Sequence, residues 1–273
     1  MTTRTTRWPE GVPCWTDVSS PDLAGSRSFY ESVLGWSFQE SGDEYGGYVL
    51  ALADGKPVAG IAPLQGDQVR PAWTLYLASD DADATAAAVS EAGGTVMVPP
   101  MDVGPLGRML IASDPAGGVF GAWSAGEHIG AGLVNEPGAM GWEDLRSTDP
   151  DAARAFYGKV FGYDFQALEA AGPDYTTFHL AGDPAPLGGM GGMFGAPDGT
   201  PSHWLVYFGA PDVDAATEAV ASSGGQVLAP GFDTPYGRMS AVVDPVGAVF
   251  WLVRPNPDLP PSGAGSPARW NVV

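Results

Sequence analysis

The chain has 273 residues, of which 32 are acidic and 12 are basic, so its formal net charge at pH 7 is −20. Such an excess of acid argues against binding to nucleic acid or to anionic membranes, because both need a basic surface. The single cysteine, Cys14, excludes an internal disulfide framework. No apolar stretch approaches the roughly 18 residues of a membrane span, and the N-terminus lacks the apolar core of a secretory signal, so we expect a cytoplasmic protein.

The predicted elements alternate in a fixed order along the first half of the chain. A strand at 13–19 leads to a helix that begins after Asp22, a residue type that favours helix N-termini, and ends at Gly35. Three strand-like segments follow, at 37–40, 47–53 and 58–64. The order then restarts with a strand at 73–79, a helix at 81–93 and strands at 95–100, 108–114 and 119–125. This half therefore contains two βαβββ units.

The second half of the chain repeats the first. Trp15, Asp17, Asp22 and Gly35 recur at a constant offset of 127 residues, as Trp142, Asp144, Asp149 and Gly162. A Phe-Tyr pair at 29–30 recurs at 156–157, and we expect Tyr30 and Tyr157 to pack a helix against a sheet. Gly-Arg-Met at 107–109 and Asp-Pro at 114–115 recur at 237–239 and 244–245. A period this long indicates two copies of a whole domain.

The sequence thus predicts an α+β protein whose four βαβββ units form two tandem domains. The domains are expected at residues 11–125 and 139–254, with a linker at 126–138. Residues 255–273 are rich in Pro, Gly and Ser, and we expect a flexible tail there.

The order of these motifs resembles that of the vicinal oxygen chelate superfamily. Each half has an Asp separated by six residues from Phe-Tyr, then a Gly-Gly pair, then Gly-Arg and finally Asp-Pro-x-Gly-x-x-Phe. The superfamily includes glyoxalase I, bleomycin-resistance proteins, fosfomycin-resistance enzymes and extradiol dioxygenases. The Cys-Trp-x-Asp sequence of the first strand is similar to that of tandem glyoxalase-like proteins often labelled hydroxylases. The resemblance implies that each domain curls into a glyoxalase-like cup.

Metal-dependent members of this superfamily place His, Gln or Glu ligands inside the cup. The corresponding positions of this chain hold, in pairs from the two halves, Trp15 and Trp142, Thr74 and Leu205, and Gly121 and Trp251. None of these side chains is a usual metal ligand. We therefore predict no metal and no cofactor.

Strand alternation predicts which side chains enter the cups instead. Trp15 and Asp17 share one face of the first strand, and Trp142, Asp144 and Arg146 share one face of its repeat. The indoles can either form an aromatic wall for a planar ligand or simply pack in the core. A carboxylate beside indoles is desolvated and can act as a general base, or it can be held by backbone N–H groups or an arginine. Asp17 and Asp144 are accordingly the candidate catalytic residues.

Other side chains join the candidate ligand-binding set by their place near these strands. The aromatic members are Trp73, Trp204, Tyr76, Tyr207 and Trp251. Arg108 and Arg238 recur in the Gly-Arg-Met motif, where they can pair with the two aspartates, clamp an anionic ligand or remain solvated. Because Gly121 leaves space where Trp251 fills it, we expect the first cup to be the roomier one.

Two hypotheses for the function remain open. The first is metal-independent binding of an apolar or planar small molecule, as in sequestration or drug resistance. The second is a metal-free enzyme, a lyase, isomerase or hydroxylase, that uses Asp17 or Asp144 as a general base. In a variant of both, one repeat binds the ligand and the other is a scaffold. The expected partner is a small molecule, and the chain is expected to act as a monomer or homodimer.

Overall fold

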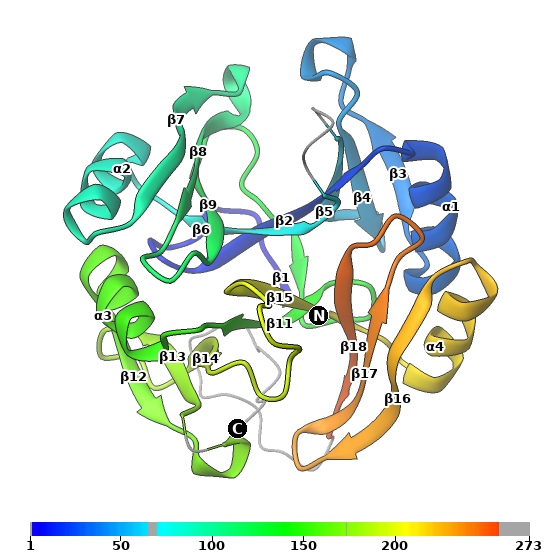
Figure 1. Cartoon of the computed structure of the whole chain (residues 1–273). Coiled ribbons are helices and arrows are strands. Elements are labelled where there is room, and N and C mark those ends of the chain that lie inside the picture. The colour runs from blue at the N-terminus through cyan, green and yellow to red at the C-terminus, as the bar shows by residue number, and fades with distance from the viewer. Residues whose placement is uncertain (1, 65–69, 173, 257–273) are drawn as a thin grey trace.

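The computed structural model describes residues 2–64, 70–172 and 174–256. It contains two large curled β-sheets (Figure 1). Each half of the chain forms one eight-stranded mixed sheet and two helices. The predicted α+β architecture of four βαβββ units is confirmed. Most of the predicted tail, from residue 257 onward, lies outside the described residues.

The first sheet has the strand order β3-β4-β5-β2-β6-β9-β8-β7. Its elements are β2 (Pro13–Ser20), α1 (Leu23–Leu34), β3 (Ser37–Glu40), β4 (Val49–Ala53), β5 (Lys56–Pro63), β6 (Trp73–Ala78), α2 (Ala82–Glu91), β7 (Thr95–Asp102), β8 (Gly107–Ser113) and β9 (Val119–Ala125). The two units meet where β2 and β6 pair antiparallel, and each of these strands pairs on its other side with the parallel last strand of its own unit.

The second sheet has the equivalent strand order, β12-β13-β14-β11-β15-β18-β17-β16. Its elements are β11 (Met140–Arg146), α3 (Pro150–Phe161), β12 (Tyr163–Ala167), β13 (Thr176–Leu180), β14 (Pro186–Gly191), β15 (His203–Gly209), α4 (Val213–Ser222), β16 (Gln226–Thr234), β17 (Gly237–Val243) and β18 (Val249–Pro255). Between the sheets, the short strands β1 (Thr2–Thr3) and β10 (Leu133–Val134) pair antiparallel.

The helix boundaries follow from the capping residues. The Asp22 side chain accepts a hydrogen bond from the Gly25 backbone N–H at 2.9 Å, and this satisfies one of the free donors of the first turn. Gly35 ends α1 in the left-handed conformation, with φ of 70°, which a residue without a Cβ adopts at little cost. Asp149 and Gly162 perform the same roles for α3. No helix among the described residues is both long and apolar enough to cross a membrane.

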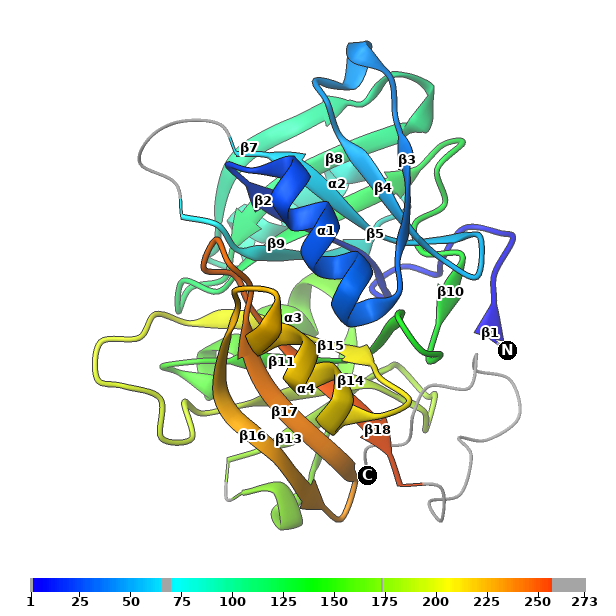
Figure 2. The ribbon, with the colours of Figure 1, turned by 90° about the vertical axis from the view of Figure 1, so that its right-hand side faces the viewer.

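The two sheets lie back to back, and each curls away from the other (Figure 1). Helix α1 lies beside α4 on one flank, and α2 lies beside α3 on the other flank (Figures 1 and 2). Strand β6 of the first sheet faces β15 of the second at the centre of the molecule. The concave faces, which are the predicted cups, therefore point in opposite directions.

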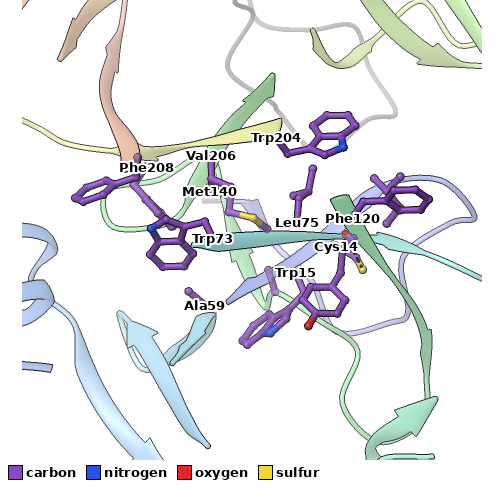
Figure 3. Close-up of a cluster of buried hydrophobic side chains, with 14 of the residues drawn as sticks. Cys14, Trp15, Ala59, Trp73, Leu75, Phe120, Met140, Trp204, Val206 and Phe208 are labelled. Carbon is purple, nitrogen blue, oxygen red and sulfur yellow. Dashed lines mark hydrogen bonds between the residues drawn. The ribbon is translucent and has the colours of Figure 1, made fainter. Parts of the chain in front are cut away.

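Aromatic side chains fill the space between the two sheets. The ring centroids of Trp73 from β6 and Phe208 from β15 lie 5.0 Å apart, and both rings are buried (Figure 3). Trp15 points to the opposite side of the first sheet (Figure 3). The two faces of each sheet therefore differ in role: the convex face forms the shared core, and the concave face forms a cup.

The repeated Phe-Tyr and Asp-Pro motifs meet across the domain interface. The hydroxyl of Tyr30 on α1 donates a 2.8 Å hydrogen bond to the carboxylate of Asp244 in the other domain. Tyr157 on α3 interacts electrostatically with the carboxylate of Asp114 of the first domain. The prediction that these tyrosines pack a helix against a sheet did not include their contacts with the other domain. A local sequence pattern does not contain this distant pairing.

Candidate functional site

Both cups contain the same four side chains, a tryptophan, an aspartate and two tyrosines. In the second cup, β11 supplies the Trp and Asp, one Tyr directly precedes β13, and the other comes from β15. The cluster of the second cup is Trp142, Asp144, Tyr175 and Tyr207, and that of the first cup is Trp15, Asp17, Tyr48 and Tyr76. The alternation along β2 and β11 therefore places both predicted aspartates beside both predicted indoles.

Asp144 is the centre of the second cluster and is almost completely buried. Its Oδ1 accepts hydrogen bonds from the Trp142 Nε1 at 2.9 Å and from the Tyr175 hydroxyl at 2.6 Å. Its Oδ2 accepts from the Tyr207 hydroxyl and from an Nη of Arg146, both at 2.8 Å. Four donors on two oxygens satisfy the carboxylate, so its burial is compensated.

Arg146 follows Asp144 by two residues on β11 and points into the same cup, as predicted. Its side chain is only 17% exposed. The guanidinium lies 4.8 Å from the ring centroid of Phe194, a residue of the loop after β14, so it is held between an ion pair and an aromatic face. Burial opposes the charge of Arg146, but Asp144, Tyr207 and Tyr175 together outweigh this effect, and the pKa of the guanidinium is raised.

These residues line a cavity of about 320 Å³ in the second cup. Trp251 packs flat against Tyr207, with ring centroids 5.2 Å apart, and Phe232 meets the edge of Trp251. The remaining lining residues come mainly from the loops and from the β16–β17 hairpin: Leu168, Ala171, Phe194, Thr234, Pro235, Tyr236 and Met239. A cavity with aromatic walls and few polar groups is typical of small-molecule sites.

The first cup has the same cluster without a cation. The Trp15 Nε1 donates to the Tyr48 hydroxyl at 2.8 Å, and this hydroxyl donates to Asp17 at 3.1 Å. Tyr76 is also hydrogen-bonded to Asp17. Burial raises the pKa of Asp17 to about 7, and the hydrogen bonds from the two tyrosines only partly counter this. The position equivalent to Arg146 is Ser19, which brings no positive charge.

The linker after β9 also contributes to the first cup. The imidazole of His128 meets the indole of Trp15 edge to face, with ring centroids 4.5 Å apart. The linker is held there because the Trp123 Nε1 donates to the His128 carbonyl at 2.8 Å. Burial lowers the pKa of His128 to about 4, so the ring is neutral at physiological pH. Sequence reasoning missed this residue, since the linker has no periodicity that indicates a site.

The expectation that the first cup is the roomier one was wrong. The space above Gly121 is filled by the ring of Tyr76, which a Cβ at this position would overlap. In the second cup, Trp251 lies flat against Tyr207 and forms a wall of the cavity. The large cavity formed by the described residues is thus in the second cup.

Four of the predicted ligand-binding residues lie outside the cups. Trp73 and Trp204 project from the other face of β6 and β15 into the shared core, where the Trp204 Nε1 donates to Tyr157 at 3.0 Å. Arg108 on β8 pairs with Asp83 of α2 and Asp102 of β7, and Arg238 on β17 pairs with Asp214 of α4 and Asp233 of β16. Of the alternatives that the sequence left open for these arginines, pairing with Asp17 or Asp144 does not occur, because acids on the adjacent helices and strands are their partners.

The second cup does not fit the metal that the superfamily resemblance implies. Trp142, Leu205 and Trp251, which stand at the ligand positions, have no oxygen or imidazole donor. The one carboxylate in the cavity lining, Asp144, is paired with Arg146 and saturated by its other donors. Throughout the described residues, no group of three or more His, Cys, Asp or Glu side chains could hold a metal ion.

A family model described as the Glyoxalase/Bleomycin resistance protein/Dioxygenase superfamily matches residues 15–120 and 130–252. The chain belongs to this superfamily. It is 40% identical over 255 residues to the "Putative glyoxylase CFP32" of Mycobacterium tuberculosis, a match that covers 91% of this chain and 96% of the relative. It is also 36% identical over 276 residues to the "Anthracycline biosynthesis protein DnrV" of Streptomyces peucetius, which covers 96% of this chain and 99% of that protein.

Solved structures share the fold at low sequence identity. The Mn(II)-bound glyoxalase from Novosphingobium aromaticivorans is 18% identical, with a TM-score of 0.61 over 89% of this chain and 81% of that one. The 2,3-dioxygenase LapB from Pseudomonas sp. KL28 is 15% identical, with a TM-score of 0.62 over 92% and 96% of the two chains. The tandem-domain architecture is therefore one that this chain has in common with extradiol dioxygenases.

Proposed function

We propose that the second cup binds a planar, largely apolar small molecule without the help of a metal ion. The observation that carries this proposal is the cavity of about 320 Å³, whose walls are aromatic and whose one carboxylate is already neutralised. Pockets for small molecules commonly begin at about this size. Flat rings such as those of Trp142 and Trp251 gain most from a ligand that can stack on them.

The first cup has a different role in this proposal. Its cluster lacks the arginine, the ring of Tyr76 fills the space above Gly121, and His128 packs on Trp15. We infer that it mainly stabilises the fold, so that the two repeats divide into a binding domain and a scaffold domain. The relative named for anthracycline biosynthesis makes anthracyclines a ligand class to test first.

Tryptophan fluorescence on titration with an anthracycline tests the proposal. We expect Trp142→Ala and Trp251→Ala to weaken binding by about 2–4 kcal/mol, as for buried aromatic anchors. Trp15→Ala, the equivalent change in the first cup, is the matched control and is expected to leave the affinity within about twofold. A loss of affinity in Trp15→Ala alone would place the ligand in the first cup and contradict the assignment.

A second candidate function rests on Asp17. Burial brings the pKa of this carboxyl to about 7, where both protonation states are populated and proton transfer is efficient. We propose as the alternative that Asp17 acts as a general base in a lyase, isomerase or hydroxylase reaction. Asp17→Asn should then abolish conversion of a bound ligand, measured by mass spectrometry, and retain its affinity. Equal conversion by the wild type and by this variant would refute the role of Asp17.

A further inference from the structure

We propose that the ligand of the second cup carries a neutral carbonyl oxygen, as a flat aromatic ketone or quinone does, and that Tyr236 and Arg146 recognise this oxygen. The inference rests on the proposed function and adds the chemical class of the ligand. It follows from a count of the donors and acceptors that the cavity leaves free.

The acceptors of the cavity are already used. Asp144 receives two hydrogen bonds on each oxygen. Two of its donors are the hydroxyls of Tyr175 and Tyr207, which therefore point their protons at the carboxylate and away from a ligand. The hydroxyl of Thr234 accepts from the backbone N–H groups of Tyr236 and Gly237, both at 3.1 Å, and donates to the Gly237 carbonyl at 2.8 Å.

Among the donors that line the cavity, the Tyr236 hydroxyl, part of Arg146 and the Nε1 of Trp251 are hydrogen-bonded to no other described residue, and of these Tyr236 and Arg146 are held by fixed polar groups. The Tyr236 hydroxyl is buried, and no described residue is its hydrogen-bond partner. A buried hydroxyl without a partner is unfavourable because it has lost its hydrogen bond to water, and a ligand acceptor would remove this penalty. Among the described residues, the guanidinium of Arg146 is hydrogen-bonded only to Asp144 and Tyr207, which leaves part of its five N–H groups unused.

The backbone holds both donors in place. Tyr236 stands at the turn between β16 and β17, and the side chain of Thr234 fixes this turn through the three hydrogen bonds given above. Arg146 is fixed by its ion pair with Asp144 and by the ring of Phe194. Donors that are positioned before binding lose little entropy when the ligand arrives, so they favour one orientation of the carbonyl.

The charges favour a neutral acceptor over an anion. Asp144 cancels the positive charge of Arg146 at 2.8 Å, so the cavity has no net charge to attract a carboxylate. The chain as a whole carries a net charge of −20, which repels anions. The first cup lacks both donors, since Leu106 and Ser19 stand in place of Tyr236 and Arg146. The preference for a carbonyl should therefore belong to the second cup alone.

Three probes that share one planar tricyclic skeleton test this inference by calorimetry: fluorene, 9-fluorenone and fluorene-9-carboxylate. We expect the wild type to bind fluorenone about three- to tenfold more tightly than fluorene, the contribution of one well-made hydrogen bond, and to bind the carboxylate more weakly than fluorenone. Tyr236→Phe should weaken fluorenone binding by about the same factor and change fluorene binding by less than twofold. Tyr45→Phe, a hydroxyl removed from the first domain, is the matched control and should change neither affinity.

The outcomes separate this inference from the proposed function. Equal affinity of the wild type for fluorene and fluorenone, or an equal loss of both in Tyr236→Phe, would overturn the carbonyl assignment and leave the planar-ligand proposal standing. Tighter binding of the carboxylate than of fluorenone would overturn the choice of a neutral group. Failure of all three probes to bind would contradict the proposed function itself.

Discussion

Replacing Asp17 by asparagine should change how the stability of the protein depends on pH. Asp17 is buried, receives hydrogen bonds from Tyr48 and Tyr76, and has no arginine or lysine partner among the described ion pairs. Its pKa is about 7 in the folded protein, compared with an ordinary value of 3.8. Asparagine has nearly the same shape and keeps hydrogen-bonding atoms, but it does not titrate. The variant therefore removes the protonation equilibrium of this one group.

The sign follows from the number of bound protons. Between pH 3.8 and about 7, the folded state holds a proton on Asp17 that the unfolded state has released, so the contribution of this group to stability falls as the pH rises. The full effect of a shift of about three pKa units is on the order of 4 kcal/mol. Of this stabilisation, about 2 kcal/mol is present at pH 5.5 and is lost by pH 8.0. The interval also avoids the isoelectric point near 4.1.

His128 acts in the opposite direction within the same pH range. Burial lowers its pKa to about 4, so its contribution to stability is lost as the pH falls through the ordinary value of 6.5. The wild-type profile alone therefore mixes the two effects. The difference between wild type and Asp17→Asn isolates Asp17, because His128 is present in both proteins.

Urea unfolding at pH 5.5 and pH 8.0 measures this difference. We expect the wild type to lose about 2 kcal/mol relative to Asp17→Asn when the pH rises from 5.5 to 8.0. Asp54→Asn, at an exposed position, is the control for removing one acid from a very acidic protein. A difference between wild type and Asp17→Asn that is constant with pH, to within about 0.5 kcal/mol, would refute the raised pKa and with it the case for Asp17 as a base.

Two further predictions concern packing. Tyr30→Phe leaves the buried Asp244 without its 2.8 Å partner from the other domain, so urea unfolding should show a loss of about 1–3 kcal/mol; an unchanged midpoint would mean that this bond contributes nothing to the interface. Gly189→Ala places a Cβ into the Tyr175 hydroxyl. The variant should lose about 1–3 kcal/mol of unfolding free energy and should bind the ligand more weakly. Gly192→Ala is the control, because its new Cβ meets no atom within 4 Å. A similar loss in that variant would show that the loss of a glycine, and not the contact with Tyr175, causes the effect.

Much of the fold could be predicted from local patterns. Capping residues such as Asp22 and Gly35 mark the helix ends, and strand alternation correctly placed Trp142, Asp144 and Arg146 on one face of β11. These features depend on neighbours along the chain, so the sequence contains them directly.

Other features depend on contacts between distant segments and could not be predicted. The roomier cup was expected in the first domain because Gly121 has no side chain. The ring of Tyr76 occupies that space, and the local sequence does not reveal this contact. Arg238 bonds to Asp214, which is 24 residues away on a helix. Tyr236 stands in a hairpin turn, where no periodicity indicates the direction of a side chain.

The central claim is that the second cup binds one planar molecule without a metal ion. Its most direct test is a calorimetric titration of untagged protein with 9-fluorenone after exhaustive dialysis against EDTA, with the metal content measured on the same sample. We predict one binding site per chain and an affinity equal to that of undialysed protein, with the heat lost in Trp251→Ala. Binding that disappears on dialysis and returns with added manganese or zinc would contradict the claim, as would two equivalent sites per chain.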